Sequence, residues 1–206
     1  GFAYMTPYYI LQQIEEVSDV ADFIIVNMHA GSEYSTAPGQ DYDYIISQNV
    51  ETNNYFGPDE IIDNMDIVDI SDEDENYTPF TDVPHMWDRE IRHFAIDNGA
   101  DLVIVHHPHV IQGFEVYNGK LIAHSLGNFV FDLSYPETFP SVILNSSIDT
   151  LNIYDFNVDP VYIDDNIPYI ATGELGLHIL DYLAFKSREL DTYMDINRTD
   201  NKGYII

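Results

Sequence analysis

The chain has no cysteine, only seven lysine and arginine residues among 206, and no apolar run near the roughly 18 residues that span a membrane. Without cysteine, disulfide bonds and thiolate metal ligands are excluded. The few basic residues face 36 Asp and Glu, which gives a formal net charge of −29. Such a surface repels phosphate backbones, so no nucleic acid partner is expected. Solubility, adaptation to salt, or recruitment of divalent cations would each explain the acidity.

The remaining composition is that of a folded protein. Hydrophobic residues make up 45% and aromatic residues 14% of the chain, and its length suits one domain. The sequence opens on Gly1 rather than Met, and residues 1–6 resemble a strand within a sheet. We therefore expect the chain to be the carboxyl-terminal part of a larger domain.

Apolar periodicity predicts alternating helices and strands. Helices are expected from Pro7 to about Ala21, from Pro84 to Gly99, and from Glu174 to about Leu190. Strands are expected at residues 23–26, 102–105, 110–117, 120–125 and 141–158, with Asn118-Gly119 as a hairpin turn. The apolar run at 23–26 is typical of a strand buried on both faces. This order predicts an α/β fold with a mixed sheet.

Residues from about Asp41 to Pro84 interrupt this pattern. They are acidic, and their periodicity is weak. We interpret them as an insertion that forms a solvated surface loop. The alternative, a calcium-binding loop, lacks the ligand order and central glycine of an EF-hand.

The most informative stretch is residues 106–109, His-His-Pro-His, directly after a predicted strand. His29 and Glu33 follow the preceding predicted strand, and the carboxyl ends of parallel strands meet at one sheet edge. Imidazoles together with a carboxylate suit manganese, zinc or iron. Such an ion can polarise a phosphoryl oxygen and activate a water molecule. The sequence therefore predicts a divalent metal site at this edge.

Each of these residues also has a simpler explanation. His29 can bond a backbone carbonyl in a turn, and either His106 or His107 can point away, because neighbours on an extended chain face opposite ways. Glu33 can orient a histidine rather than bind metal, and Asn128 can cap a turn rather than contact substrate. The other histidines outside this region, His85, His93 and His178, are predicted to be structural.

Three motifs resemble the CapA family of poly-γ-glutamate capsule synthesis. Residues 27–34 are similar to its His-Trp-Gly-x-Glu-Tyr segment. Residues 99–110 resemble Gly-Ala-Asp-Leu-Val-Ile-Gly-His-His-Pro-His-Val, and residues 122–129 resemble Ile-Ala-Tyr-Ser-Leu-Gly-Asn-Phe. The chain departs from these motifs at Ala30, Val105 and His124, where the family has Trp, Gly and Tyr. His124 adds either a ligand or a hydrogen bond, and we favour the hydrogen bond.

The resemblance implies a calcineurin-like metallophosphatase fold, an α/β sandwich, in which these residues belong to a bimetal centre. It assigns metal binding to His29, His107 and His109, catalysis to His29, Glu33 and His106, and substrate contacts to Ser125 and Asn128. The family's remaining ligands would precede Gly1, so we expect this chain alone to bind metal weakly. The cofactor would be manganese, zinc or iron.

The resemblance also implies a role in capsule or cell-surface polymer synthesis. The expected activity is phosphoester cleavage, and the alternatives are a non-catalytic assembly subunit or a general small-substrate phosphodiesterase. Partners would be the capsule polymer or a phosphoester, together with membrane-bound capsule synthesis subunits. The expected location is the cell surface or outside it, anchored through a segment that precedes Gly1.

Overall fold

The computed structural model describes residues 5–31, 33–38 and 87–206. The predicted insertion at 41–84 and His85 lie outside these residues, as does most of the strand expected at 1–6. Three helices are described: α1 (Pro7–Ser18), α3 (Trp87–Asp97) and α4 (Gly173–Arg188), with the short 3₁₀ turn η1 (Pro136–Thr138). The three predicted helices are thus confirmed, each within a few residues of its expected ends.

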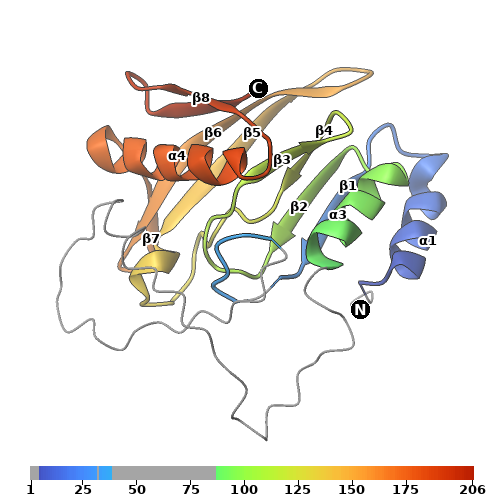
Figure 1. Ribbon diagram of the computed structural model, residues 1–206, viewed down its shortest axis with the longest axis horizontal. Coiled ribbons are helices and arrows are strands. Elements are labelled where there is room, and N and C mark those ends of the chain that lie inside the picture. The colour runs from blue at the N-terminus through green and yellow to red at the C-terminus, as the bar shows by residue number, and fades with distance from the viewer. Residues whose placement is uncertain (1–4, 32, 39–86) are drawn as a thin grey trace, which may run out of the picture.

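Two sheets organise the described chain (Figure 1). The first has the order β1-β2-β4-β3, with strands β1 (Ile25–His29), β2 (Leu102–His106), β3 (Phe114–Tyr117) and β4 (Lys120–Ala123). The second has the order β5-β6-β9-β8, with β7 also paired to β6. Its strands are β5 (Pro140–Ile148), β6 (Ile153–Asp164), β7 (Ile167–Ile170), β8 (Met194–Asn197) and β9 (Lys202–Ile205). The first sheet joins parallel and antiparallel pairs, so the predicted α/β fold with a mixed sheet is confirmed.

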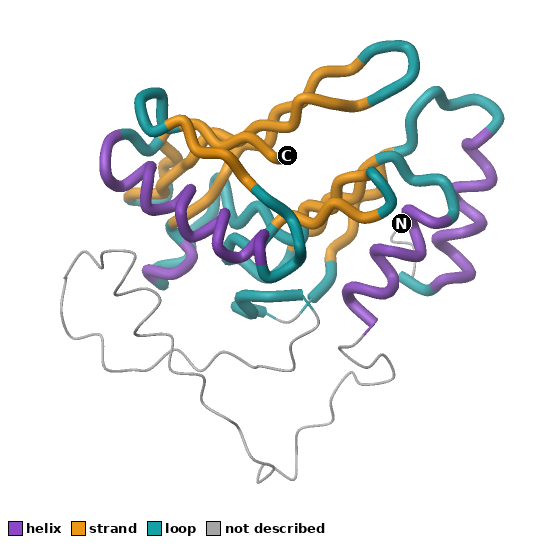
Figure 2. The backbone as a smooth tube through the Cα atoms, turned by 45° about the horizontal axis from the view of Figure 1, so that its top comes forward, coloured by secondary structure: helices purple, strands orange, loops and turns teal. Residues whose placement is uncertain are grey.

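The first sheet separates two hydrophobic cores. On one face, Val103, Val105 and Ile122 pack with apolar side chains of α1 and α3, and these two helices lie side by side in Figures 1 and 2. On the other face, Leu102 and Leu121 belong to a core shared with α4 and the second sheet. The strand β2 contributes to both cores, and burial of this apolar surface is the main force that fixes its position.

Local signals account for several boundaries. Thr6 caps α1, accepting a hydrogen bond from Tyr9 N–H at 3.4 Å. Gly99, at φ +112°, follows the end of α3 in the left-handed conformation that glycine adopts without strain. Asn118 and Gly119 both have positive φ, as the predicted hairpin between β3 and β4 requires.

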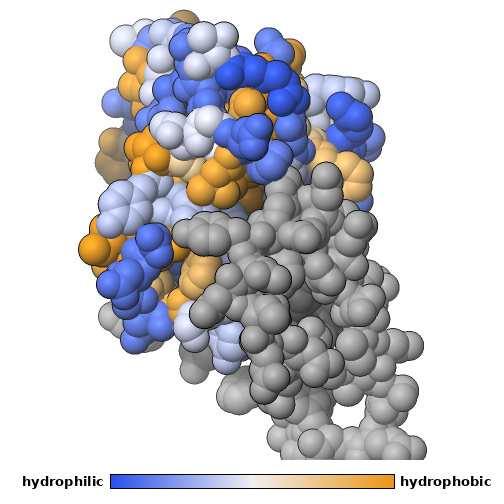
Figure 3. All heavy atoms as spheres, turned by 90° about the vertical axis from the view of Figure 1, so that its left-hand side faces the viewer, coloured by the Kyte–Doolittle hydropathy of each residue, from blue (hydrophilic) through white to orange (hydrophobic). Residues whose placement is uncertain are grey.

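The strand at the amino-terminal side differs from its prediction. β1 begins at Ile25 rather than Phe23 and continues to His29. Its burial was predicted wrongly, because Ile25 is 46% exposed. Among the described residues β1 pairs with β2 alone, so it lies at the edge of this sheet. On the face drawn in Figure 3, the coloured residues show small apolar groups among polar ones.

Candidate functional site

The site lies where the two parallel strands β1 and β2 end. His29 and His106 are the last residues of these strands and are register partners across the sheet. The Ala30 N–H donates to the His106 carbonyl at 2.8 Å, which ties the two following loops together. The sequence prediction that both histidine-bearing segments reach one sheet edge is therefore confirmed.

The loop after β2 turns its histidines toward His29. The ring centroids of His29 and His107 are 4.6 Å apart, and those of His107 and His109 are 5.8 Å apart. His107 (φ +117°) and His109 (φ +62°) have left-handed backbone conformations, which are costly for residues other than glycine. Such strain is common at functional sites, and here it gathers three imidazoles. The His106 side chain is exposed at the strand end.

Asn128 fixes the orientation of His109. Its Oδ1 lies 2.8 Å from His109 Nδ1, and an amide oxygen accepts, so Nδ1 carries the proton. In the neutral ring, Nε2 then has a free lone pair, and this atom lies 3.8 Å from Glu33 Oε1. The Asn128 side chain is thus part of the site and does more than cap a turn. Glu33 therefore lies beside His109, and both roles expected of it, catalysis and orientation of a histidine, stay predictions.

Aromatic side chains flank the same imidazole. Phe131 and Tyr34 have ring centroids 5.0 Å and 5.9 Å from that of His109, and Tyr135 contacts Tyr34. Burial and the neighbouring Glu33 raise the pKa of the Tyr34 phenol. These rings, which sequence reasoning did not assign to the site, form one wall beside His109.

Two hydrogen bonds hold the loop that carries Glu33. The Tyr34 N–H donates to the Pro108 carbonyl at 2.8 Å. Gln112 is buried, and its Nε2 donates to the Ser35 carbonyl at 2.6 Å. The two hydrogen-bond partners, Pro108 and Gln112, both lie in the segment that follows β2. The loop that carries Glu33 is therefore attached beside the histidines at two positions.

Partial desolvation favours the neutral form of two of the clustered imidazoles. Desolvation, reinforced by the proximity of His29, lowers the pKa of both His106 and His107 below its ordinary value. Glu33 and Asp88 oppose this shift at His107. Neutral imidazoles have a lone pair that can accept a proton or a metal ion.

Ser125 occupies a turn next to this site. Its side chain is buried, and its Oγ accepts a hydrogen bond from the Gly127 N–H at 3.2 Å. The Ser141 hydroxyl donates to the carbonyls of Leu126 and Asn128, which fixes the same turn from the second sheet. The substrate contact expected of Ser125 stays a prediction, and the role that the structure shows is to shape the turn before Asn128.

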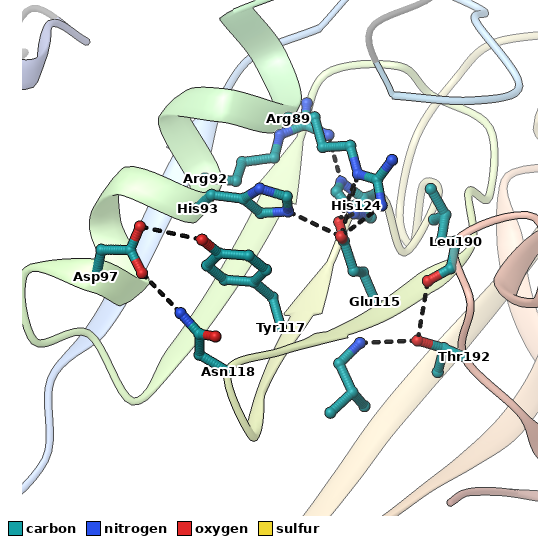
Figure 4. A network of polar contacts seen from close by, with 11 residues as sticks. Arg89, Arg92, His93, Asp97, Glu115, Tyr117, Asn118, His124, Leu190 and Thr192 are labelled. Carbon is teal, nitrogen blue, oxygen red and sulfur yellow. Dashed lines mark hydrogen bonds and ion pairs between the residues drawn. The ribbon is translucent and has the colours of Figure 1, made fainter.

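A buried charged network lies behind the site, and sequence reasoning did not anticipate it (Figure 4). Arg92 of α3 is fully buried, and its Nη1 lies 2.6 Å from His124 Nδ1. His124 Nε2 lies 2.9 Å from Glu115 Oε2 of β3. His124 therefore forms hydrogen bonds, as the sequence analysis favoured. The signal for an ion pair was the spacing of four between Asp88 and Arg92, but nothing in that spacing indicates burial.

Glu115 joins this network to two further side chains of α3. Arg89 binds the carboxylate through Nε and Nη2, and His93 Nε2 lies 2.8 Å from Oε1. Burial alone would raise the pKa of Glu115, but the hydrogen bonds from His124, Arg89 and His93 outweigh it and hold the pKa at about 2. His93 also stacks on Tyr117 at 3.7 Å, so the structural role predicted for it is confirmed.

The residues at the sheet edge have the chemistry of a transition-metal site, and we tested whether their arrangement fits one. The donors are imidazoles in ring contact, with one free lone pair fixed on His109 by Asn128. Within residues 5–31, 33–38 and 87–206, however, no three His, Asp or Glu side chains form a group that could hold one ion. The donor types fit a metal, whereas the ligand geometry of the described residues alone is incomplete.

The fold and the site together define an α/β protein with a histidine cluster at the carboxyl edge of a mixed sheet. Residues 77–133 match a family model described as "Bacterial capsule synthesis protein PGA_cap". This range contains residues 106–109 and Asn128, whereas His29 and Glu33 precede it.

Curated proteins give a consistent result. The chain is 38% identical over 85 residues to the PGA biosynthesis protein CapA of Bacillus subtilis (strain 168), covering 41% of this chain and 22% of that protein. It is 26% identical over 179 residues to the capsule biosynthesis protein CapA of Bacillus anthracis, covering 85% of this chain and 32% of that protein. The chain is thus similar to CapA proteins of capsule synthesis, and it spans less than a third of the length of these two relatives.

Proposed function

We propose that this chain acts in the synthesis of poly-γ-glutamate capsule or another cell-surface polymer, as part of a metal-dependent phosphoesterase. The names of the two Bacillus relatives, which refer to PGA and capsule biosynthesis, support a role in synthesis of this polymer. The observation that carries the chemistry is the convergence of His29, His107 and His109 at one sheet edge, with Asn128 fixing one ring.

Different residues of the chain have different roles in this proposal. His29, His107 and His109 would each contribute a ligand to a centre of manganese, zinc or iron ions, and ligands from outside the described residues would complete the coordination. When bound, such an ion polarises a phosphoryl oxygen and lowers the pKa of a water molecule. Exposed His106 and Glu33 lie at the solvent side, where each can accept a proton from an incoming water molecule. Asn128 keeps the Nε2 lone pair of His109 available, and Ser125 shapes the turn next to the substrate.

Charge limits the partners that suit this chain. A net charge of −29 repels a polyanion such as nucleic acid or poly-γ-glutamate unless cations lie between them. We therefore propose small phosphoesters, or a polymer end bridged by metal, as substrates. No described helix is long and apolar enough to cross a bilayer. A location at the cell surface, with membrane-bound capsule synthesis subunits as partners, is part of the proposal.

Metal binding and hydrolysis test this function. Zn²⁺ and Mn²⁺ are titrated into the chain by calorimetry, and hydrolysis of bis(p-nitrophenyl) phosphate is followed with each ion. We expect weak binding and slow turnover, both lost in His29→Gln and His107→Gln. His178→Gln is the matched control, since His178 lies on α4 outside the cluster.

Each alternative function gives a different result. If neither ion binds and no phosphodiester is cleaved, the metallophosphatase proposal fails. Cosedimentation with poly-γ-glutamate under those conditions would then favour a non-catalytic assembly subunit. Equal turnover of unrelated small phosphodiesters, without any polymer binding, would favour a general phosphodiesterase.

A further inference from the structure

Gly31 lies at the point where the two histidine-bearing loops meet α3. A Cβ placed on it would lie 3.3 Å from Arg92 Nη2, 3.3 Å from Pro108 Cγ and 3.4 Å from Asp88 Oδ2. Gly31 is two residues after His29, and Pro108 stands between His107 and His109. The Asp88 carboxylate, the Arg92 guanidinium and the Pro108 ring therefore all lie close to Gly31.

Arg92 cannot contact a substrate, because it is fully buried. Its Nη2 lies 3.7 Å from Asp88 Oδ2, and its Nη1 is held by His124 at 2.6 Å. His124 is anchored in turn by Glu115, which Arg89 and His93 also hold. A chain of polar contacts thus runs from Glu115 of β3 through His124 and Arg92 to the Asp88 carboxylate, which lies near Gly31.

Asp88 has the surroundings of a carboxylate that positions a histidine. It is 9% exposed, lies on the first turn of α3, and is one of two carboxylates whose charge acts on His107. The other, Glu33, has the larger effect but is about half exposed, so Asp88 is the buried carboxylate of the two. In metal proteins, carboxylates behind a ligating histidine fix the orientation of its ring.

We propose that Asp88, held in place by Arg92, is a positioning residue that sets the relative placement of His29 and His107. The inference concerns the site of the proposed function, but it makes a claim about the metal-free protein. It can therefore fail while the proposed activity stands, and the reverse also holds. Neither residue is assigned a chemical step.

The test compares Asp88→Asn and Arg92→Lys with the unmodified chain. Asn keeps the size of Asp88 without its charge, and Lys keeps the charge of Arg92 but cannot bind Asp88 and His124 together. Asp97→Asn is the matched control: Asp97 is on the same helix, and its carboxylate accepts hydrogen bonds from Tyr117 and Asn118, away from the cluster. Ring-to-ring nuclear Overhauser effects between His29 and His107 are measured at pH 8 without metal, at a temperature where every variant is folded.

The 4.6 Å ring contact predicts a strong Overhauser effect between His29 and His107 in the unmodified chain. We expect Asp88→Asn and Arg92→Lys to weaken it markedly, and Asp97→Asn to leave it unchanged. The same two variants should weaken Zn²⁺ binding by about 10-fold or more, as for other residues behind metal ligands. An unchanged Overhauser effect in folded Asp88→Asn would overturn the proposal. Equal loss in Asp97→Asn would also overturn it, since the effect would then reflect general destabilisation of α3.

Discussion

Arg92 Nη1 lies 2.6 Å from His124 Nδ1, and both side chains are fully buried. Burial lowers the pKa of Arg92 to about 10, so the guanidinium remains charged at neutral pH and can only donate. His124 must therefore accept at Nδ1 and donate its Nε2 proton to Glu115. The contact between Arg92 and His124 thus fixes the tautomer of the imidazole and the direction of its hydrogen bond to Glu115.

Removing the buried guanidinium should destabilise the fold. In Arg92→Met, Asp88 loses its contact with the guanidinium and His124 loses a donor, and breaking a buried charged contact costs about 3 kcal/mol. We expect the free energy of unfolding in urea to fall by roughly that amount. Arg198→Met is the control, because Arg198 and Asp181 form an exposed ion pair that is worth under about 1 kcal/mol. Equal losses in both variants would contradict the role of burial.

Stability should decline as the pH falls, in two overlapping ranges. Burial lowers the pKa of His124 to about 4, so the unfolded chain takes up a proton first as pH falls below about 6.5. Glu115 has a pKa of about 2 in the folded state, so its contribution is present above its ordinary value of 4.5 and lost below it. Urea unfolding between pH 7 and pH 3 measures this decline.

Single substitutions separate these two contributions. His124→Gln should flatten the decline between about pH 6.5 and pH 4, because no imidazole remains to be protonated. Glu115→Gln should lower stability at pH 7 and flatten the decline below pH 4.5. A pH profile identical to that of the unmodified chain in both variants would disprove the assignment.

Gly31 and Gly119 provide a matched pair for measuring packing at the cluster. Both have positive φ, at +102° and +73°, so alanine is strained at either position. A Cβ at Gly119 meets nothing within 4 Å, whereas one at Gly31 presses on Arg92, Pro108 and Asp88. We expect Gly119→Ala to cost about 1 kcal/mol and Gly31→Ala roughly 1–3 kcal/mol more. Thermal unfolding measures the stability that each variant loses. Equal losses would mean that Arg92, Pro108 and Asp88 move away from the new Cβ without cost.

Asn128 should control the tautomer of His109. In Asn128→Ala the acceptor for Nδ1–H is lost, and the imidazole should become a mixture of both neutral tautomers. Long-range ¹H–¹⁵N spectra at pH 8 distinguish these forms directly. Asn145→Ala, which removes a contact with Asp159 in the second sheet, is the control and should leave His109 unaffected. A single Nδ1–H tautomer in Asn128→Ala would show that other contacts set the ring.

Much of the fold follows from local patterns in the sequence. Apolar spacing located the three helices, and Asn118-Gly119 located the hairpin, because these signals depend on residues close together in the chain. The strands β8 and β9 were not anticipated, since each has four residues and little alternation. The exposure of Ile25 was missed because an apolar run does not reveal whether its strand has one neighbour or two.

The sequence predicted which residues form the site, but not the backbone conformations and buried contacts that hold them in place. The sequence indicated that His29 and residues 106–109 would meet, because both follow strands of one sheet. It gave no sign of the positive φ of His107 and His109, since these residues are not glycine. Burial of Arg92 and Glu115 was also hidden, because charged residues on an amphipathic helix and a hairpin are normally solvated. Arg92 contacts His124, 32 positions away, and Glu115 binds Arg89, 26 positions away, so neither contact is visible in the local sequence.

The placement of β2 between two cores has a consequence for the genetics of this protein. Val103 and Val105 face one core and Leu102 the other, and the same strand continues into His106. A substitution in either core can therefore shift the histidines by moving the strand as a unit. Second-site mutations that compensate for a defect in the histidine cluster should therefore arise in α1 or α4 as readily as beside the site. They should restore function by returning β2 to its original position.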